Sequence, residues 1–201
     1  MTAFTSHCWK SWLERWRLCL LSLLLTLGCL PTLAASLEFR YTELVPSEQE
    51  YLLNASVNLQ LNRRLQEMIE AGVALPFRVE FSLTRPRWYW INETISERLL
   101  ELRLSYHALT RQYRVSVGSL HRNFASFEEA CRALQSLHNW SVVDRSRLQD
   151  NENYIANLRF RLDVNALPKP FQVAALGSRD LDLDTGKVSW AVVALPFKEV
   201  R

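Results

Sequence analysis

Three aspartates near the C-terminal end of the chain have the spacing of a calcium-binding loop. Asp180, Asp182 and Asp184 occupy alternate positions, and their carboxylates could supply the hard oxygen ligands that Ca²⁺ prefers. The rest of the loop pattern is missing, because the sixth position is Thr185 instead of glycine and the twelfth is Ala191 instead of glutamate. The same spacing is also that of a strand, with the leucines between the aspartates facing inward before a Thr-Gly turn. We favour the strand and keep the three aspartates as an alternative calcium site.

Two tryptophans are the other residues that could form a binding site. Trp88 and Trp90 are two positions apart, on one face of an extended segment with Tyr89 opposite. If exposed, they could stack on a sugar ring or hold a partner protein. If buried, they would fill the core, since aromatic side chains carry much of the packing area of a domain. We favour the buried interpretation and keep the pair as the candidate interaction site.

The remaining residue types that do chemistry are not grouped. The histidines beyond the N-terminal segment are His107, His121 and His138, and no two of them have the spacing of a metal-ligand pair. Cys131 falls inside an expected helix, where a thiolate would not be stabilised. The sequence contains no nucleophile elbow, P-loop or dinucleotide-binding fingerprint. We therefore predict no catalytic residue, no cofactor, no metal and no enzymatic activity.

The first 34 residues have the parts of a cleavable signal peptide. A basic start precedes the apolar run 18–30, which is too short for a stable membrane anchor and ends at Pro31. Thr32 and Ala34 then supply the small residues that signal peptidase requires, so we expect cleavage after Ala34, with Ala35 as the alternative. These residues predict an exported protein of the periplasm or cell envelope.

Two other fates of this segment follow from the same residues. Without cleavage, residues 18–35 are just long enough to hold the chain in the inner membrane as a signal anchor. Gly28-Cys29 resembles the end of a lipoprotein signal, which would place a lipid on Cys29, although the preceding Thr26-Leu27 departs from the usual order. Apart from an uncleaved signal, only a weak surface contact with membrane is expected.

Removing the segment changes the charge of the chain. It takes three of the 24 Lys and Arg residues and one of the 21 Asp and Glu residues, so the net charge falls from +3 to +1. A nearly neutral domain has no electrostatic footprint for nucleic acid, and we predict no such partner. Cys131 is then the single cysteine, so no internal disulfide can form and the core must supply the stability.

Residues 35–201 alternate apolar and polar residues in short runs, which predicts strands with one buried and one wet face. Two segments change to helical spacing: 62–71, which ends before Gly72, and one beginning at Ser126, which forms a capping box with Glu129 and carries an apolar stripe to Leu137. The expected strands are 37–41, 53–61, 77–84, 100–106, 113–117, 158–164 and 188–192. We predict a mainly β (α+β) fold, an antiparallel β-sandwich or half-barrel with two packed helices, as a single domain over residues 35–201.

Five arginines fall on the polar faces of these strands and could form a basic stripe for anionic lipid or a polyanion. They are Arg78, Arg103, Arg114, Arg159 and Arg161. Because Glu80, Glu101 and Asp163 share those faces, we expect cross-strand ion pairs instead.

Motifs spread over the chain resemble those of a known family. They are the leucine-rich N-terminal segment, Arg85-Pro-Arg-Trp-Tyr-Trp90, Leu167-Pro-Lys-Pro-Phe171, the aspartate-rich turn and Trp190. Together they resemble a family of uncharacterised exported proteobacterial proteins that is described as a domain of unknown function and is sometimes labelled "proline-rich signal peptide protein". The resemblance implies a bacterial envelope setting, often beside a nitrogen-regulation-type sensor kinase, and it supplies no catalytic residues.

These observations predict a non-enzymatic binding or interaction module of the bacterial envelope. The partner that the resemblance implies is a membrane sensor kinase. The alternative is a periplasmic carrier of a small ligand or lipid, with an apolar cavity between sheet and helices. A packed core with exposed tryptophans would favour the module, and a large enclosed cavity would favour the carrier.

Overall fold

The computed structural model describes residues 36–89, 91–175 and 177–194. The chain divides into two compact units, Met1–Leu33 and Ala34–Arg201, and every described residue belongs to the second. The expectations of cleavage at Ala34 or Ala35 and of a lipid on Cys29 fall on residues outside the described ranges. None of the helices formed by the described residues has the length and hydrophobicity to span a bilayer.

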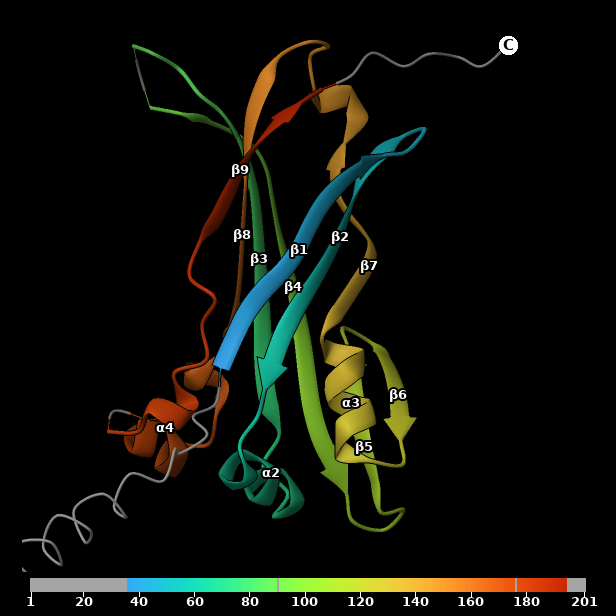
Figure 1. The fold of residues 1–201 in the computed structure, drawn as a ribbon, viewed down its shortest axis with the longest axis vertical. Helices are drawn as coiled ribbons and strands as arrows, with labels where there is room; N and C mark the ends of the chain where they lie inside the picture. Colours follow the sequence, from blue (N-terminus) through green and yellow to red (C-terminus); the bar gives the residue numbers. More distant parts are fainter. Residues whose placement is uncertain (1–35, 90, 176, 195–201) are drawn as a thin grey trace, which may run out of the picture. The chain divides into compact units, whose positions relative to one another are not determined.

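Two antiparallel sheets form the framework of the second unit (Figure 1). The smaller sheet has the strand order β1-β2-β7, and the larger has the order β6-β5-β4-β3-β8-β9. The strands are β1 (Ser36–Pro46), β2 (Glu50–Gln60), β3 (Leu75–Arg85), β4 (Glu93–His107), β5 (Gln112–Val117), β6 (Leu120–Phe124), β7 (Ser136–Asp144), β8 (Asn153–Leu162) and β9 (Val188–Val193). The helices are α2 (Arg63–Glu70), α3 (Phe127–Leu134) and α4 (Lys169–Ala175). The predicted mainly β fold is confirmed, as a sandwich.

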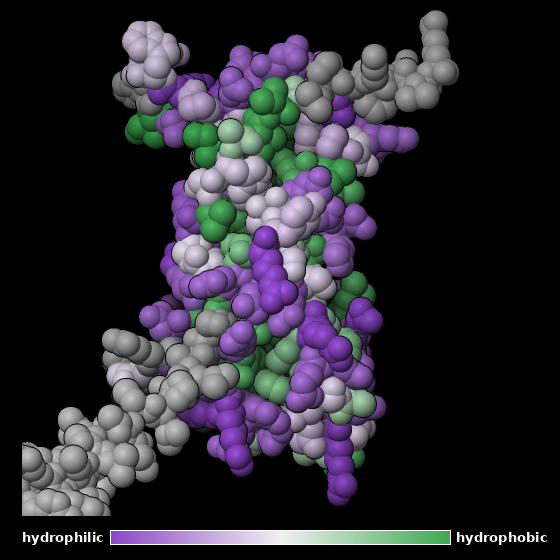
Figure 2. All heavy atoms as spheres, viewed as in Figure 1, coloured by the Kyte–Doolittle hydropathy of each residue, from purple (hydrophilic) through white to green (hydrophobic). Residues whose placement is uncertain are grey.

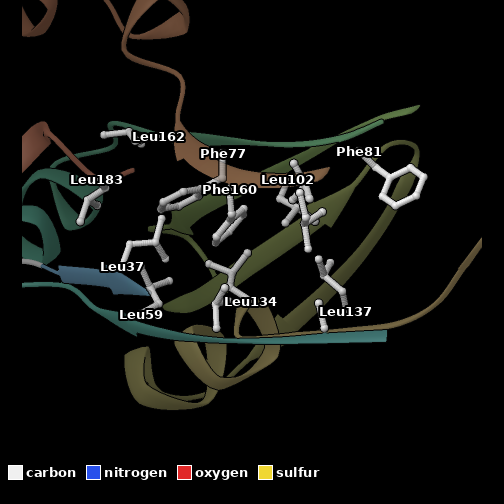
Figure 3. Packing of buried hydrophobic residues seen from close by; sticks show 14 of the residues in the cluster. Leu37, Leu59, Phe77, Phe81, Leu102, Leu134, Leu137, Phe160, Leu162 and Leu183 are labelled. Atoms are coloured by element: carbon white, nitrogen blue, oxygen red, sulfur yellow. The ribbon is translucent and has the colours of Figure 1, made fainter. Parts of the chain in front are cut away.

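Alternation places the core between the two sheets. Every second side chain of β3 is buried from Leu75 to Leu83 because successive side chains of a strand point to opposite faces. Figure 3 shows the result, with Phe77 and Phe160 stacked at a ring distance of 5.5 Å. Leu134 of α3 reaches into the same core.

A buried hydrogen bond joins the sheets. The hydroxyl of Ser96 on β4 donates to the carbonyl of Val142 on β7 over 2.6 Å. Ser96 is one of the few buried polar residues among those described. This bond gives a donor to a backbone oxygen that would otherwise be buried without a hydrogen bond.

Both predicted helix starts are confirmed at the level of single atoms. The Asn62 side chain accepts from the N–H of Leu65 over 3.0 Å and begins α2, and Gly72 follows its end with a φ of +92°. The Ser126 hydroxyl accepts from the N–H of Glu129 over 3.2 Å and begins α3. The prediction that the apolar stripe of this helix extends to Leu137 is wrong, because α3 ends at Leu134 and Leu137 belongs to β7, which pairs with β2.

Candidate interaction surface

The hairpin between β3 and β4 ends in an apolar tip, which we define as residues 86–92. The last residue pair that joins the two strands is Arg85 and Glu93. Pro86 follows Arg85, and because proline has no N–H it cannot extend the ladder of hydrogen bonds. The described residues of the tip, 86–89 and 91–92, therefore leave the sheet, and the end of the hairpin projects at the upper left in Figure 1 and Figure 2.

The described side chains of the tip face solvent. Trp88 is 95% exposed, Ile91 79% and Tyr89 65%. The rings of Trp88 and Tyr89 meet edge to face, with centroids 5.2 Å apart. The prediction that Trp88 fills the core is wrong: the proline and the turn carry it beyond the end of the sandwich, where no second sheet covers it. Trp90, the other residue of the candidate pair, lies outside the described residues.

The base of the tip is held by charged groups. Oε2 of Glu93 accepts from Arg85 Nη2 over 2.7 Å and from Arg87 Nη2 over 2.6 Å. The hydrogen bond from Arg87, followed by that from Arg85, lowers the pKa of the Glu93 carboxyl, so that it is charged at neutral pH. Sequence reasoning missed this cluster, because Arg85 and Glu93 become neighbours only once the hairpin has formed.

A second set of contacts ties the tip to the core. Arg85 Nη1 donates to the side-chain oxygen of Gln149 over 2.9 Å. The backbone N–H of Gln149 donates in turn to the hydroxyl of Tyr154 over 2.8 Å, and Tyr154 is almost completely buried. The side chains of Trp88, Tyr89 and Ile91 are thus exposed, whereas the strand end that carries the tip is anchored to the core.

This arrangement is suited to binding a protein. Tryptophan, tyrosine and arginine are the residue types that dominate the energy of protein interfaces. Aromatic rings offer large contact area for few rotatable bonds, and an anchored backbone reduces the entropy lost on association. Exposed apolar groups gathered at one place mark interaction sites more often than scattered ones do.

The three aspartates of the alternative calcium site point to separate partners. Asp180 Oδ1 accepts from the Asn62 side chain over 2.6 Å, and Asp184 is paired with Arg159, whose hydrogen bond lowers the pKa of the Asp184 carboxyl. Asp182 is exposed. Within the described ranges, no three His, Cys, Asp or Glu side chains are grouped as metal ligands. The inward-facing leucines and the turn at Gly186, which has a positive φ, are as predicted, but the predicted strand is wrong, because Arg179–Leu181 form a 3-10 helix and only Asp184 makes a bridge, to Arg161.

The outward-facing arginines mostly form the expected cross-strand pairs. Arg161 pairs with Glu80 over 2.7 Å, and Arg78 pairs with the buried Asp163 over 2.8 Å. Arg159 is held by Asp184. Because these pairs cancel their charges, the face of the larger sheet is mixed in sign and does not form a basic stripe.

The interior between the sheets is filled with side chains. The largest of those that are fully buried include Tyr154, Phe77, Phe81 and Phe160. Hollows found among the described residues open on the surface, such as one of about 440 Å³ on the outer face of the larger sheet. Its lining includes Glu80, Glu97, Arg98, Arg159 and Lys187. A charged, open hollow of this kind does not resemble an apolar carrier cavity.

Among the described residues, Cys131 and the histidines are not grouped as metal ligands. Cys131 lies inside α3, as predicted, and is buried; burial raises the pKa of its thiol to about 12, so that it is uncharged at neutral pH. The ring of His107 contacts the hydroxyl of Thr110, which lies three residues further on.

Comparison with known protein families matches residues 34–191 to a family model described as "Domain of unknown function (DUF4390)". A search of curated proteins and a search of solved structures each gave no match.

Proposed function

The chain belongs to the DUF4390 family, and from the position of Trp88 we propose that it is a non-enzymatic interaction module of the bacterial envelope that binds a partner protein through the tip. The observation that carries this proposal is the combination of a tryptophan that is 95% exposed with a backbone anchored through Arg85 and Glu93. Exposed apolar side chains cost solubility, so such a combination favours a side chain that becomes buried in a complex.

Export is part of the proposal. It is supported by the basic start, short apolar run and small residues of the first 34 positions. The boundary between the two compact units falls between Leu33 and Ala34, and the family model begins at residue 34. Both boundaries lie one residue before the cleavage point expected after Ala34.

The position of the tip bears on the kind of partner. β1 begins at Ser36, at the end of the sandwich that carries α2, whereas the tip lies at the opposite end of β3 (Figure 1). The 11 residues of β3 separate these ends by about 35 Å. The tip thus lies at the end of the sandwich remote from Ser36. Its tryptophan, tyrosine and arginine are residue types that dominate protein interfaces, so a protein, such as the sensory part of a membrane kinase, is a better partner than lipid.

The alternative function, carriage of a lipid or small ligand, has less support. A carrier buries most of its ligand in an apolar cavity, whereas the core here is packed and the hollow on the larger sheet is open and charged. The exposure of Trp88 also has no role in a carrier.

Photocrosslinking in intact cells tests the proposal. A photoreactive phenylalanine analogue is placed at Trp88, and as a matched control at Leu109, which is 92% exposed in the turn between β4 and β5. We expect one protein adduct from position 88 that is absent from position 109. Adducts with lipid alone, equal adducts from both positions, or none at position 88 would each contradict the proposal.

A further inference from the structure

Strand β9 is an edge of the larger sheet as the described residues form it. It pairs with β8 on one side, and the order of the sheet ends with it. An edge strand leaves a row of backbone N–H and C=O groups without a partner strand, and these groups can pair with another chain. Proteins usually block such pairing with charges, proline or a bulge.

The other free edges carry these protections. In β1 the register shifts between Phe39 and Tyr41, and charged Glu38, Arg40 and Glu43 lie along the strand. The pairing of β7 with β2 shifts register twice, and β6 contains Arg122. Each of these strands would therefore pair poorly with a straight partner strand.

Strand β9 carries none of these protections. Its six residues, Val-Ser-Trp-Ala-Val-Val, include no charge and no proline. Its register with β8 runs from Leu158 to Asn153 without a shift. Ser189, Ala191 and Val193 on its outer face are exposed.

The sequence of β9 is symmetric in residue type about Trp190. Val188 and Val192 flank it at equal distance, and so do the small residues Ser189 and Ala191. We propose that β9 pairs antiparallel with β9 of a second copy of this chain, centred on Trp190, so that the two larger sheets become continuous.

Pairing centred on Trp190 places compatible side chains opposite each other on both faces of the joined sheet. On the inner face Trp190 would lie opposite its own copy, and Val188 opposite Val192 of that copy. Aromatic pairs and pairs of β-branched residues stabilise neighbouring strands. On the outer face Ser189 would lie opposite Ala191, where both side chains are small enough to avoid a clash. No like charges are brought together within the strand, so two identical edges fit without repulsion.

Antiparallel pairing also sets the orientation of the two copies. A two-fold axis through Trp190 reverses one copy relative to the other and keeps both cores on the same side of the joined sheet. The two tips then point in opposite directions, and neither is covered by the pairing. The inference is therefore independent of the proposed binding at Trp88.

Disulfide trapping tests both the pairing and its register. Full-length chains with Ser189→Cys or Ala191→Cys are expressed, one of them with a mass tag, then mixed and oxidised mildly. In the proposed register, the thiol introduced at position 189 of one copy faces the thiol introduced at position 191 of the other copy within disulfide reach. Two thiols at the same position, 189 with 189 or 191 with 191, are diagonal neighbours and lie too far apart for a disulfide. Random pairing would give roughly twice as much mixed disulfide as disulfide between two identical variants. We expect the mixed disulfide to exceed that ratio clearly.

The controls separate this result from accidental oxidation. The unsubstituted chain measures the background from the native cysteines, and Glu43→Cys tests the protected edge β1. If the mixed disulfide between Ser189→Cys and Ala191→Cys is no more abundant than the disulfide between two Glu43→Cys chains, the inference is overturned. Dominance of one identical pair would overturn the register centred on Trp190, and trapping of other cellular proteins without any pair would assign the edge to a different partner.

A second measurement needs no cysteine. Ala191→Lys places a charge on the exposed edge, and Tyr41→Lys does the same on β1, where Tyr41 is 50% exposed. In sedimentation experiments we expect the wild-type chain and Tyr41→Lys to dimerise with rising concentration, and Ala191→Lys to remain monomeric. A wild-type chain that is monomeric throughout would overturn the inference.

Discussion

Arg85 and Glu93 face each other where β3 and β4 separate, and Arg85 Nη2 lies 2.7 Å from Glu93 Oε2. This pair marks the boundary between two kinds of structure. Below it the side chains alternate between core and solvent, and above it Trp88 and Ile91 are exposed. We expect the pair to stabilise the end of the hairpin and to limit the motion of the apolar tip.

Replacing Glu93 with glutamine tests this bracing. Glu93→Gln removes the charge that two guanidinium groups share, so we expect faster amide hydrogen exchange across residues 86–92 and unchanged exchange in β3 and β8. Glu97→Gln, an exposed position on β4 that forms no ion pair with the described residues, is the control. Unchanged exchange in the tip would show that the ion pairs do not order it.

The pair of Asp184 and Arg159 predicts a specific dependence on pH. The hydrogen bond from Arg159 lowers the pKa of Asp184 in the folded state, so this carboxylate stabilises the fold above its ordinary pKa of 3.8. That contribution is lost as the pH falls through the lower pKa of the folded state. The advantage of the wild type over Asp184→Asn in unfolding free energy should therefore be constant near neutral pH and shrink below about pH 4.

Urea unfolding of both proteins between pH 7 and pH 3 measures this difference, with Asp182→Asn at an exposed position as the control. An advantage that grows toward low pH would contradict the assignment.

The hydrogen bond from Ser96 to Val142 joins the two sheets, so removing it should lower the stability of the fold. Ser96→Ala removes the donor to the Val142 carbonyl in a buried place that water cannot reach. We expect the free energy of unfolding to fall by about 1–3 kcal/mol, measured by urea unfolding. Ser116→Ala, on β5, removes a hydroxyl that is not buried and should change it by less than about 0.5 kcal/mol. Equal effects of the two substitutions would contradict a structural role for the bond.

The sequence predicts the regular part of the fold well because burial on one face imposes alternation. β2, β3 and β9 alternate without interruption, and the caps at Asn62 and Ser126 act within four residues, so local sequence is sufficient to find them. The ion pairs of Arg78, Arg159 and Arg161 follow from the same alternation.

The missed elements have specific physical causes. β7 is irregular because its register with β2 shifts twice and Asn139 has a positive φ, which hides the alternation and made Leu137 look helical. β6 is exposed along nearly its whole length, so it has no buried face to reveal it. α4 is short and has no buried residue among those described.

The sequence identified a residue of the candidate site but did not predict that its side chain is exposed. The sequence identifies Trp88 as unusual, yet an aromatic residue beside a strand is more often buried than exposed. Its exposure depends on where the hairpin ends, which is decided by Pro86 and by the meeting of Arg85 with Glu93. That meeting joins residues eight positions apart and has no periodic signal.

The central claim is that Trp88 supplies binding energy for a partner protein. The most direct measurement is the dissociation constant of that partner, once crosslinking has identified it, for the wild type, Trp88→Ala and Leu109→Ala, with unfolding free energies measured in parallel. We predict that Trp88→Ala weakens binding by about tenfold or more, as truncation of an interface tryptophan does, with stability unchanged within about 0.5 kcal/mol because the side chain is exposed. Leu109→Ala should bind like the wild type. Equal affinities for the wild type and Trp88→Ala would contradict the account.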